Sequence, residues 1–434
     1  MTRILRGPVL RFRADPFAEG AEAALGWLDD GAVAIEGGRI AAVGEATEVI
    51  ATHPGAEVTT SGGHVIAPGF VDCHLHYPQT GIIASWGAQL LDWLNTYTFP
   101  EEARFSDPAH AATVARAFFD LTLAHGITTT ASYCTIHPAS VDAYFSEAQA
   151  RGLRVVGGRT MMDRNAPDAL RDTAQAAYEE SRALIALWHG QGRATYAITP
   201  RFAPTSTPAQ LEAAGALWAE HPDCLMQTHL SENHAEIDWV ARLFPEAADY
   251  LGVYQRFGLA GPGAVFGHAI HLTARERAAL AGTGAGVAHC PTSNHFLGSG
   301  ECDVAGLKEL GIPVGLATDV GGGSSFSMFD TMKAAYEIGQ RRGVALSPVH
   351  LWWLATEGAA RTLRLGAHVG NLEAGREADL ILIDPASTPI LAARTARATT
   401  PSELMFALIV LADDRAVGQV WSAGRPVNPR APVR

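Results

Sequence analysis

Apolar runs typical of strands alternate with amphipathic stretches typical of helices through the middle of this chain. Candidate helices with a period near 3.6 residues cover 109–124, 169–188, 208–219 and 274–281. The strand-like runs lie near 65–76, 127–133, 153–161, 194–202, 224–231, 264–271, 285–290 and 313–319. Such an alternation is the signature of a parallel barrel of eight βα units. We therefore predict an α/β fold class with a TIM-like (β/α)8 barrel over residues 65–370.

Both ends of the chain carry strand-like segments instead of this alternation. Residues 32–36 and 39–44 flank Gly37-Gly38, a two-residue turn that favours a β-hairpin. Near the other end, residues 379–384 are typical of a strand and 418–425 resemble a second hairpin. We predict that residues 1–64 and 371–434 together form a small β-sandwich domain.

The composition suits an enzyme with a large core and excludes several classes of partner. Of the 434 residues, 47% are hydrophobic and 18% are charged, which fits one large barrel and a smaller domain. The net charge of −13 repels phosphates, so we expect no nucleic-acid partner. We also expect no membrane partner, because no apolar run has membrane-spanning length and the start lacks a signal-peptide layout. The five cysteines include no C-x-x-C pair, which favours reduced thiols in a cytoplasmic protein.

Ionisable side chains fall at the carboxyl ends of four predicted strands, where barrel active sites gather. His74 and His76 end the first strand, and their i, i+2 spacing directs both imidazoles to the same side. His229 ends the fifth strand, His268 lies on the sixth, and Asp319 ends the eighth. Any one of them alone is more often a hydrogen-bonded structural residue. Five suitable residues at four strand ends favour a shared site.

Four of these side chains form a candidate metal site: His74, His76, His229 and Asp319. Three imidazoles and one carboxylate leave a position open for water, as catalytic zinc requires, and the same ligands accept iron or manganese. A metal lowers the pKa of its water and so provides a nucleophile at neutral pH. The spacing leaves open whether His268 is a further ligand.

Glu232, three residues past His229, is placed to transfer protons at this site. Its alternative role is that of an acidic residue in the first turn of a helix, where the helix dipole favours it. We predict the catalytic role, and we predict Glu232, His268 and Asp319 as the catalytic residues.

Four motifs resemble the amidohydrolase superfamily: Pro68–His76, His229–Glu232, Gly267-His268 and Thr318-Asp319. Residues 370–380 are similar to the point where members of that family re-enter their β domain, so the resemblance spans essentially the whole chain. Some members bridge two metals with a carboxylated lysine on the fourth strand. This chain has no lysine before Lys308, which leaves a single-metal site of the deaminase kind.

Within the superfamily, the chain resembles the guanine deaminases. The motifs that carry this narrower resemblance are His76–Gln79, Leu90–Glu101, Pro200–Phe202, His229–Asn233, His289–Asn294 and Thr318–Gly322. The segment from Trp93 to Pro100 is the most specific of them. The loop Ala203–Ser206 departs from the family's more serine- and cysteine-rich pattern, which concerns the pocket rim and not the metal site.

The resemblance implies hydrolysis of guanine to xanthine and ammonia by a metal-activated water, in a homodimer. Asp319 would assist in deprotonating the water, which attacks C2 of the base. Glu232 would protonate N3 and relay a proton to the departing ammonia, while His268 hydrogen-bonds the attacking oxygen.

A purine pocket is also implied. Arg201 only donates hydrogen bonds and Gln79 can orient its amide, so adenine, which has a donor in place of the 6-oxo acceptor of guanine, would be rejected. Phe202 would lie against the purine face. The predicted substrate contacts are His76, Gln79, Arg201, Phe202, His229, Glu232 and Asp319. Without the resemblance, each of these three residues also fits a structural role. Arg201 could form an ion pair at the rim, Phe202 could pack in the core, and Gln79 could be a solvated loop residue.

Two other functions fit parts of the pattern. The first is deamination of a related ring, such as 8-oxoguanine, a hydroxy-triazine or thiomethyladenosine, on the same scaffold. The second is a non-catalytic scaffold that works by self-assembly. Proteins of that second kind lose metal ligands, whereas this chain keeps every expected ligand together with Glu232.

Overall fold

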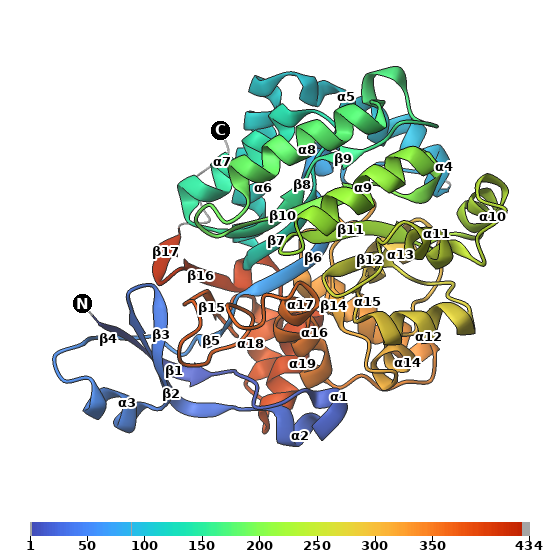
Figure 1. Ribbon diagram of the computed structural model, residues 1–434. Coiled ribbons are helices and arrows are strands. Elements are labelled where there is room, and N and C mark those ends of the chain that lie inside the picture. Colours follow the sequence, from blue (N-terminus) through green and yellow to red (C-terminus); the bar gives the residue numbers. More distant parts are fainter. Residues whose placement is uncertain (1, 88, 428–434) are drawn as a thin grey trace. The chain divides into compact units, whose positions relative to one another are not determined.

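The computed structural model describes residues 2–87 and 89–427 (Figure 1). Contacts divide the chain into two compact units. The sheet unit comprises Met1–Val71, Asp120–Thr129 and Phe326–Arg434, and the barrel unit comprises Asp72–Phe119 and Thr130–Ser325. The division falls inside the first two barrel strands. The domain boundaries at residues 64/65 and 370/371 remain a prediction.

The sheet unit contains an eight-stranded sheet to which both ends of the chain contribute, as the sequence predicts. The strand order is β17-β16-β15-β5-β1-β2-β3, and β4 pairs in parallel with β1. The strands are β1 (Arg3–Val9), β2 (Leu28–Glu36), β3 (Arg39–Glu45), β4 (Glu57–Thr60), β5 (Val65–Pro68), β15 (Leu380–Ile383), β16 (Val417–Ser422) and β17 (Arg425–Val427).

Both predicted hairpins are present in this sheet. Gly37 and Gly38, between β2 and β3, have φ values of +57° and +84°. Ala423 and Gly424, between β16 and β17, have φ values of +46° and +70°. Two successive residues with positive φ make the tight turn whose twist matches that of antiparallel strands.

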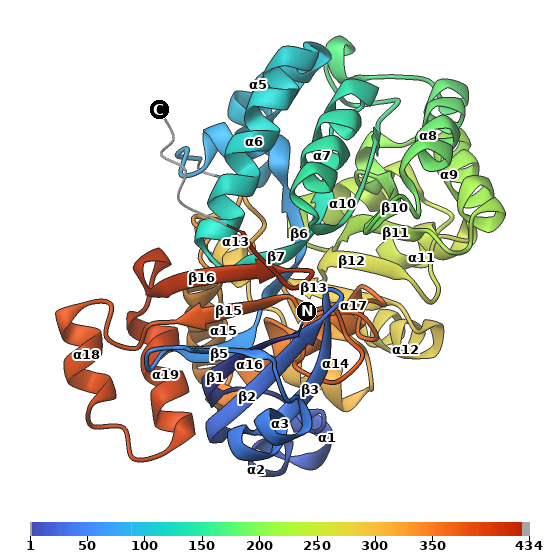
Figure 2. The ribbon, with the colours of Figure 1, turned by 90° about the vertical axis from the view of Figure 1, so that its left-hand side faces the viewer.

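Helices of the sheet unit lie near both ends of the sequence, and the longer ones lie near the C-terminal end. Trp352 and Trp353 lie on α16 (Pro348–Leu354) and are buried. The sequence did not predict α18 and α19. These two helices follow β15 and precede β16 along the chain, and they pack against each other (Figure 2). The helices are α1 (Pro16–Glu19), α2 (Ala21–Ala24), α3 (Ala46–Thr52), α15 (Met328–Arg341), α16 (Pro348–Leu354), α17 (Glu357–Thr362), α18 (Pro389–Thr395), α19 (Pro401–Leu411) and the 3-10 turn η6 (Asp414–Ala416).

The second sheet is the predicted parallel barrel, with strand order β14-β13-β12-β11-β10-β8-β7-β6 and the short β9 paired with β10. Asp319 N donates to His74 O at 3.0 Å, and His76 N donates to Val320 O at 3.3 Å, which links the last strand to the first. The strands are β6 (Phe70–His76), β7 (Ile127–Tyr133), β8 (Arg154–Gly158), β9 (Thr160–Met161), β10 (Ala194–Pro200), β11 (Leu225–Leu230), β12 (Ala264–His268), β13 (Gly286–His289) and β14 (Val314–Leu316).

Helices connect the barrel strands, and α7, α8 and α9 pack against β8 and β10 (Figure 1). The longer ones are α6 (Pro108–Ala124), α7 (Pro138–Arg151), α8 (Ala174–Trp188), α9 (Pro208–Glu220), α10 (His234–Leu243), α11 (Tyr250–Arg256) and α12 (Ala274–Thr283). The shorter ones are η1 (Tyr77–Ile82), α4 (Leu90–Trp93), η2 (Leu94–Thr98), α5 (Phe99–Ala103), η3 (Arg104–Ser106), η4 (Asp168–Leu170), η5 (Ala203–Thr205), α13 (Pro291–Phe296) and α14 (Val304–Glu309).

The predicted helix over 169–188 is wrong at its start. A separate 3-10 turn covers Asp168–Leu170, and α8 begins only at Ala174. The side chain of Thr173 accepts a hydrogen bond from Ala176 N, and this N-cap fixes the first turn of the helix.

The segment between β6 and α6 packs on an apolar cluster in the barrel unit. Leu90, Trp93 and Leu94 contribute to it from α4 and η2, and Phe99 contributes from α5. This packing holds α5 against the barrel mouth, where its polar side chains reach the site described below. All five cysteines are buried thiols. Among the described residues, no helix combines the length and apolarity needed to span a bilayer.

Candidate active site

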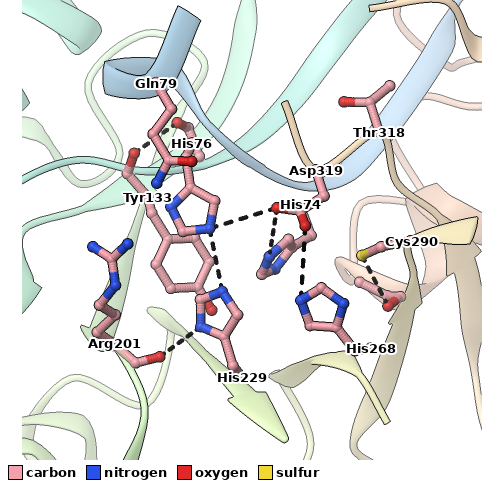
Figure 3. A network of polar contacts seen from close by, with 12 residues as sticks. His74, His76, Gln79, Tyr133, Arg201, His229, His268, Cys290, Thr318 and Asp319 are labelled. Carbon is pink, nitrogen blue, oxygen red and sulfur yellow. Dashed lines mark hydrogen bonds and ion pairs between the residues drawn. The ribbon is translucent and has the colours of Figure 1, made fainter. Parts of the chain in front are cut away.

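Five ionisable side chains converge at the carboxyl end of the barrel strands (Figure 3). β6 carries two of them, β11 and β12 carry one each, and the last follows β14. All five are buried. We call them the histidine–aspartate cage: His74, His76, His229, His268 and Asp319.

The donor atoms of the cage lie close together. His76 Nε2 lies 3.2 Å from His229 Nε2 and 3.6 Å from Asp319 Oδ1. His74 Nε2 lies 3.4 Å from the same carboxylate oxygen. On the other side, His268 Nε2 lies 3.8 Å from Asp319 Oδ2. The carboxylate of Asp319 therefore faces three of the four rings.

Hydrogen bonds behind two of the rings fix which nitrogen faces the cage. His229 Nδ1 lies 2.6 Å from the carbonyl oxygen of Arg201, which only accepts, so Nδ1 carries the proton. His268 Nδ1 lies 2.8 Å from Asn294 Oδ1 in the same manner. Such partners orient a ring and assign its tautomer, as they do behind metal-ligating histidines.

The protonation of the cage follows from burial and charge. Burial lowers the pKa of His74, and it lowers the pKa values of His76 and His229 well below the ordinary value. These three rings are therefore neutral and present lone pairs. Burial also opposes the charged form of His268, but Glu232 and Asp319 outweigh it and raise the pKa of that ring.

The donor set fits a transition metal. Donor atoms of His74, His76 and His229 lie within 4.8 Å of one another, as do those of His74, His268, Cys290 and Asp319. His74 Nε2 is buried without a hydrogen-bond partner among the described residues, a state that costs about 1–3 kcal/mol. A cation held by these atoms would supply the missing partner. Burial raises the pKa of Cys290 well above its usual value, so this thiol stays protonated and is the poorest ligand of the set.

The backbone at two cage positions adopts a conformation that non-glycine residues rarely take. His268 has a φ of +67° and Asp319 a φ of +50°. The neighbouring Thr318 donates from its N–H to Asp72 Oδ1 at 3.1 Å, and from its hydroxyl to the other oxygen of that carboxylate. Strain of this kind persists where surrounding contacts enforce it, and it is common at functional sites.

Glu232 is the acid beside the cage. It is 3% exposed, and its Oε2 lies 3.5 Å from His268 Nε2. The hydroxyl of Ser299 donates to the other carboxylate oxygen at 3.0 Å. Burial raises the pKa of Glu232 to about 7, so the group can both accept and release a proton near neutral pH.

A pocket adjoins the cage and Glu232. Its apolar lining consists of Leu90, Trp93, Leu94, Phe202 and Leu297, and its polar lining includes Gln79 and Arg201. Concave sites with apolar walls and a few convergent polar groups are typical of small-molecule binding. The pocket therefore offers space for a ligand directly against the cage.

Gln79 and Arg201, which line one side of this pocket, are hydrogen-bonded to Glu102 behind them. Gln79 Nε2 donates to Glu102 Oε1 at 2.8 Å, and Arg201 Nη1 donates to Glu102 Oε2 at 2.6 Å. The guanidinium of Arg201 also lies over the ring of Phe99, 5.6 Å from its centroid. The ring of Phe202 lies 6.3 Å from that of His229 in an edge-on arrangement. We call Gln79, Glu102, Arg201 and Phe202 the recognition wall.

Comparison with known proteins identifies the family. Residues 65–427 match the amidohydrolase family, and residues 31–56 match a bacterial imidazolonepropionase-like composite domain. The chain is 41% identical to the guanine deaminase of Escherichia coli (strain K12) over 94% of its length and 93% of that protein. It is 41% identical to the probable guanine deaminase of Deinococcus radiodurans over 99% of both chains. The solved structure of the Escherichia coli guanine deaminase matches with a TM-score of 0.96 at 40% identity, over 98% of this chain and 99% of that one.

The chain belongs to the amidohydrolase family. The expected fold class of this amidohydrolase, an α/β TIM-like barrel with a small β domain built from both chain ends, is confirmed, and the β domain that was expected as a sandwich contains the second sheet. The barrel carries a candidate metal site of histidines and one aspartate at its strand ends.

The structure brings every sequence-predicted site residue of this amidohydrolase to one place. The predicted ligands His74, His76, His229 and Asp319 lie in the cage, where His268 joins them. Glu232, Gln79, Arg201 and Phe202 line the same pocket. Of the alternatives left open from the sequence, solvation of Gln79 is wrong, since this side chain is buried.

Sequence reasoning missed the groups that hold these residues. Glu102 directly follows the motif Leu90–Glu101, but both Glu101 and Glu102 lie in the first turn of α5, where acids are common without any further role. Asn294 lies at the end of the motif His289–Asn294, and the sequence alone assigns it no role. Ser299 lies in a loop and gives no local signal. Contacts between distant segments, and not local pattern, make these side chains important.

Proposed function

We propose that this protein hydrolyses guanine to xanthine and ammonia, a step of purine breakdown. The observation that carries the proposal is the buried Glu232, which lies beside His268 of the histidine–aspartate cage and lines the pocket together with Arg201 and Gln79. An acid with a pKa of about 7 beside a metal-type cage suits the addition of water and the loss of an amine. The near full-length identity of 41% to guanine deaminases supports the same substrate.

We propose that His74, His76, His229 and Asp319 hold one zinc ion per subunit. Neutral imidazoles and a carboxylate suit zinc, and they also accept iron or manganese, so elemental analysis decides between these metals. When bound, the ion would supply Lewis-acid chemistry that makes a water more acidic. His268, whose pKa is raised by the neighbouring carboxylates, is assigned to hydrogen bonding with the attacking oxygen and not to ligation.

The recognition wall accounts for the choice of base. Arg201 donates toward the 6-oxo group of guanine, and Gln79 hydrogen-bonds the neighbouring ring edge. Adenine would place a donor amine against the guanidinium and leave it unpaired, which hydrogen-bonding pockets penalise strongly. Phe202 lies against the purine face together with the apolar lining. His76, His229, Glu232 and Asp319 contact the base at the reacting end.

Protons move through Glu232 and Asp319 in the proposed reaction. Water forms a C2–O bond and gives up a proton with help from Asp319, while Glu232 protonates N3 of the ring. Glu232 then takes up the proton released from the water and passes it to the amine, so that the C2–N bond breaks and ammonia departs. The remaining hydroxyl proton returns to Glu232 as the C2=O bond forms. Guanine and water therefore give xanthine and ammonia with atoms balanced, and His268 stabilises the charge that develops on the added oxygen.

The alternatives are less well supported. Deamination of 8-oxoguanine, a hydroxy-triazine or thiomethyladenosine would use the same cage, but the two relatives at 41% identity are a guanine deaminase and a probable guanine deaminase. A non-catalytic scaffold would not need the buried Glu232 or the paired tautomer contacts behind His229 and His268. We also propose a cytoplasmic homodimer. The buried thiols support the compartment, and light scattering tests the assembly.

The decisive experiment incubates purified, zinc-reconstituted protein with guanine and measures xanthine by absorbance and ammonia by a coupled assay. We expect both products in equal amounts, and one zinc per chain by elemental analysis. Adenine, 8-oxoguanine and a hydroxy-triazine are tested in parallel. Protein that contains zinc and turns over none of the guanine would overturn the proposal, and faster turnover of another ring would favour the alternative.

A further inference from the structure

We propose that Glu102 is a positioning residue that sets the hydrogen-bonding polarity of the recognition wall and thereby selects guanine over other 2-aminopurines. This inference rests on the proposed function, because it concerns how that substrate is chosen. Glu102 hydrogen-bonds Gln79 and Arg201 and is not among the residues that line the pocket, so it acts through those two side chains.

The carboxylate of Glu102 determines which end of the Gln79 amide faces the pocket. Gln79 is 2% exposed and Glu102 is 1% exposed, so neither exchanges its partner freely with water. A carboxylate only accepts hydrogen bonds, and therefore Gln79 must turn its NH₂ group toward Glu102. The distance from Gln79 Nε2 to Glu102 Oε1 is 2.8 Å. The amide oxygen is left as an acceptor that makes no hydrogen bond with the described residues.

Gly321 provides the room for this orientation. A Cβ atom on Gly321 would lie 1.9 Å from Gln79 Oε1, so the oxygen lies directly against the bare backbone there. The next residue, Gly322, lines the pocket. Gln79 itself also lines the pocket, so we place its amide oxygen, the end turned away from Glu102, at the pocket side of the wall.

The second oxygen of Glu102 holds Arg201. Only Nη1 of the guanidinium is used in this contact, and its remaining donors make no hydrogen bond with the residues that the structure describes. Arg201 is 3% exposed and packs over Phe99, which comes from the same short helix as Glu102. Figure 3 shows Gln79 and Arg201 on one side of the cage. Glu102 therefore fixes an acceptor and a set of donors next to each other.

This pair of groups complements one edge of guanine. The 6-oxo group accepts from Arg201, and the adjacent N1–H donates to the oxygen of Gln79. 2-Aminopurine has the same amino group at the reacting C2 but lacks the 6-oxo group and has an unprotonated N1. It would leave Arg201 unpaired and set the N1 lone pair against the Gln79 oxygen, and unpaired buried groups are costly. The two bases thus differ only where the wall acts.

Replacement of Glu102 by glutamine tests this inference. The Glu102→Gln variant keeps the size of the side chain but provides a donor and an acceptor, which allows the Gln79 amide to turn over and loosens Arg201. We expect kcat/KM for guanine to fall about 100-fold, mainly through KM, while kcat/KM for 2-aminopurine changes by about threefold or less. The ratio of the two values should therefore fall by more than about tenfold, with zinc content unchanged.

Glu101→Gln is the matched control, because Glu101 is the adjacent acid on α5 but pairs with Arg104 and His110 instead of the wall. We expect this variant to keep the ratio within about twofold of the original. If Glu102→Gln does not fold, Glu102→Asp keeps the charge beside Arg201 and shortens the reach, and it should lower the same ratio. Equal losses on both bases, or an unchanged ratio in the variant that folds, would overturn the inference. Inactivity of the unaltered protein on guanine would instead overturn the proposed function.

Discussion

The histidine–aspartate cage and the recognition wall lie side by side but are held in different ways. Cage side chains stand on or just after strand ends, and backbone groups or a single amide orient them, as the Arg201 carbonyl does for His229. Wall side chains stand on η1, on α5 and after β10, and two of them are held by the carboxylate of Glu102. The cage is thus fixed by the barrel itself, and the wall by contacts between side chains.

Because the two regions are held differently, we expect the cage to determine metal binding and turnover and the wall to determine the choice of base. Changes in the cage should remove the metal and turnover together, whereas changes in the wall should alter KM and the choice of base while the metal stays bound. Arg201 belongs to both regions, because its carbonyl orients His229 and its guanidinium lines the pocket. Variants that keep its backbone in place therefore test the wall alone.

The largest expected effect is that of His229→Ala in the cage. Loss of this imidazole removes one of the three neutral donors, so zinc content should fall sharply and guanine turnover should drop below detection. Elemental analysis and a xanthine assay measure both. His53→Ala is the control, since His53 contacts the carbonyl oxygen of Val49 away from the pocket and should change neither quantity. A His229→Ala protein with full zinc and full activity would break the assignment of the cage.

Glu232→Gln should give the next largest effect and separate metal binding from proton transfer. The amide fills the same space but cannot exchange a proton, so we expect kcat to fall by about 10²–10⁴ with zinc content unchanged. Ser299→Ala, which removes the hydrogen bond to the Glu232 carboxylate, should lower kcat by about tenfold or less. A kcat for Glu232→Gln close to that of the original protein would exclude Glu232 as the acid.

The same difference explains which parts of the site the sequence predicts. Cage residues must be of metal-binding types, and strand periodicity places His74 and His76 on one side without any knowledge of distant contacts. Glu102 gives no such signal, because adjacent acids in the first turn of a helix look alike until tertiary contacts bury one of them. Local sequence patterns therefore predict the residues of the cage better than they predict the residues of the recognition wall.

The fold shows a similar limit. The barrel strands and both hairpins follow from apolar runs and glycine turns, because these are local signals. The helices α18 and α19 interrupt the expected succession of strands near the C-terminal end, between β15 and β16. Their sequence is apolar, and short apolar runs do not by themselves distinguish a buried helix from a strand.

Arg201→Lys tests the wall with a moderate expected effect. Lysine keeps a positive charge beside Glu102 but lacks the planar set of donors, so one contact to the 6-oxo group is lost. We expect kcat/KM for guanine to fall about 100-fold, mostly through KM, with zinc content unchanged. Steady-state kinetics and elemental analysis measure this. Loss of zinc in this variant would contradict the separation between wall and cage, since the backbone carbonyl behind His229 is retained.

Phe202→Leu should have the smallest effect. It tests the residue that lies where the cage and the recognition wall meet. The ring lines the pocket and lies edge-on to His229, so it contacts both regions. Leucine keeps the apolar character but loses the flat surface, and an aromatic contact of this kind is worth about 0.5–1.5 kcal/mol, or about twofold to tenfold in KM. Trp239→Phe, which alters the packing behind Phe202 without touching the pocket, is the control and should leave KM unchanged. A fall in kcat with unchanged KM would instead show that Phe202 acts by holding His229, and would assign it to the cage.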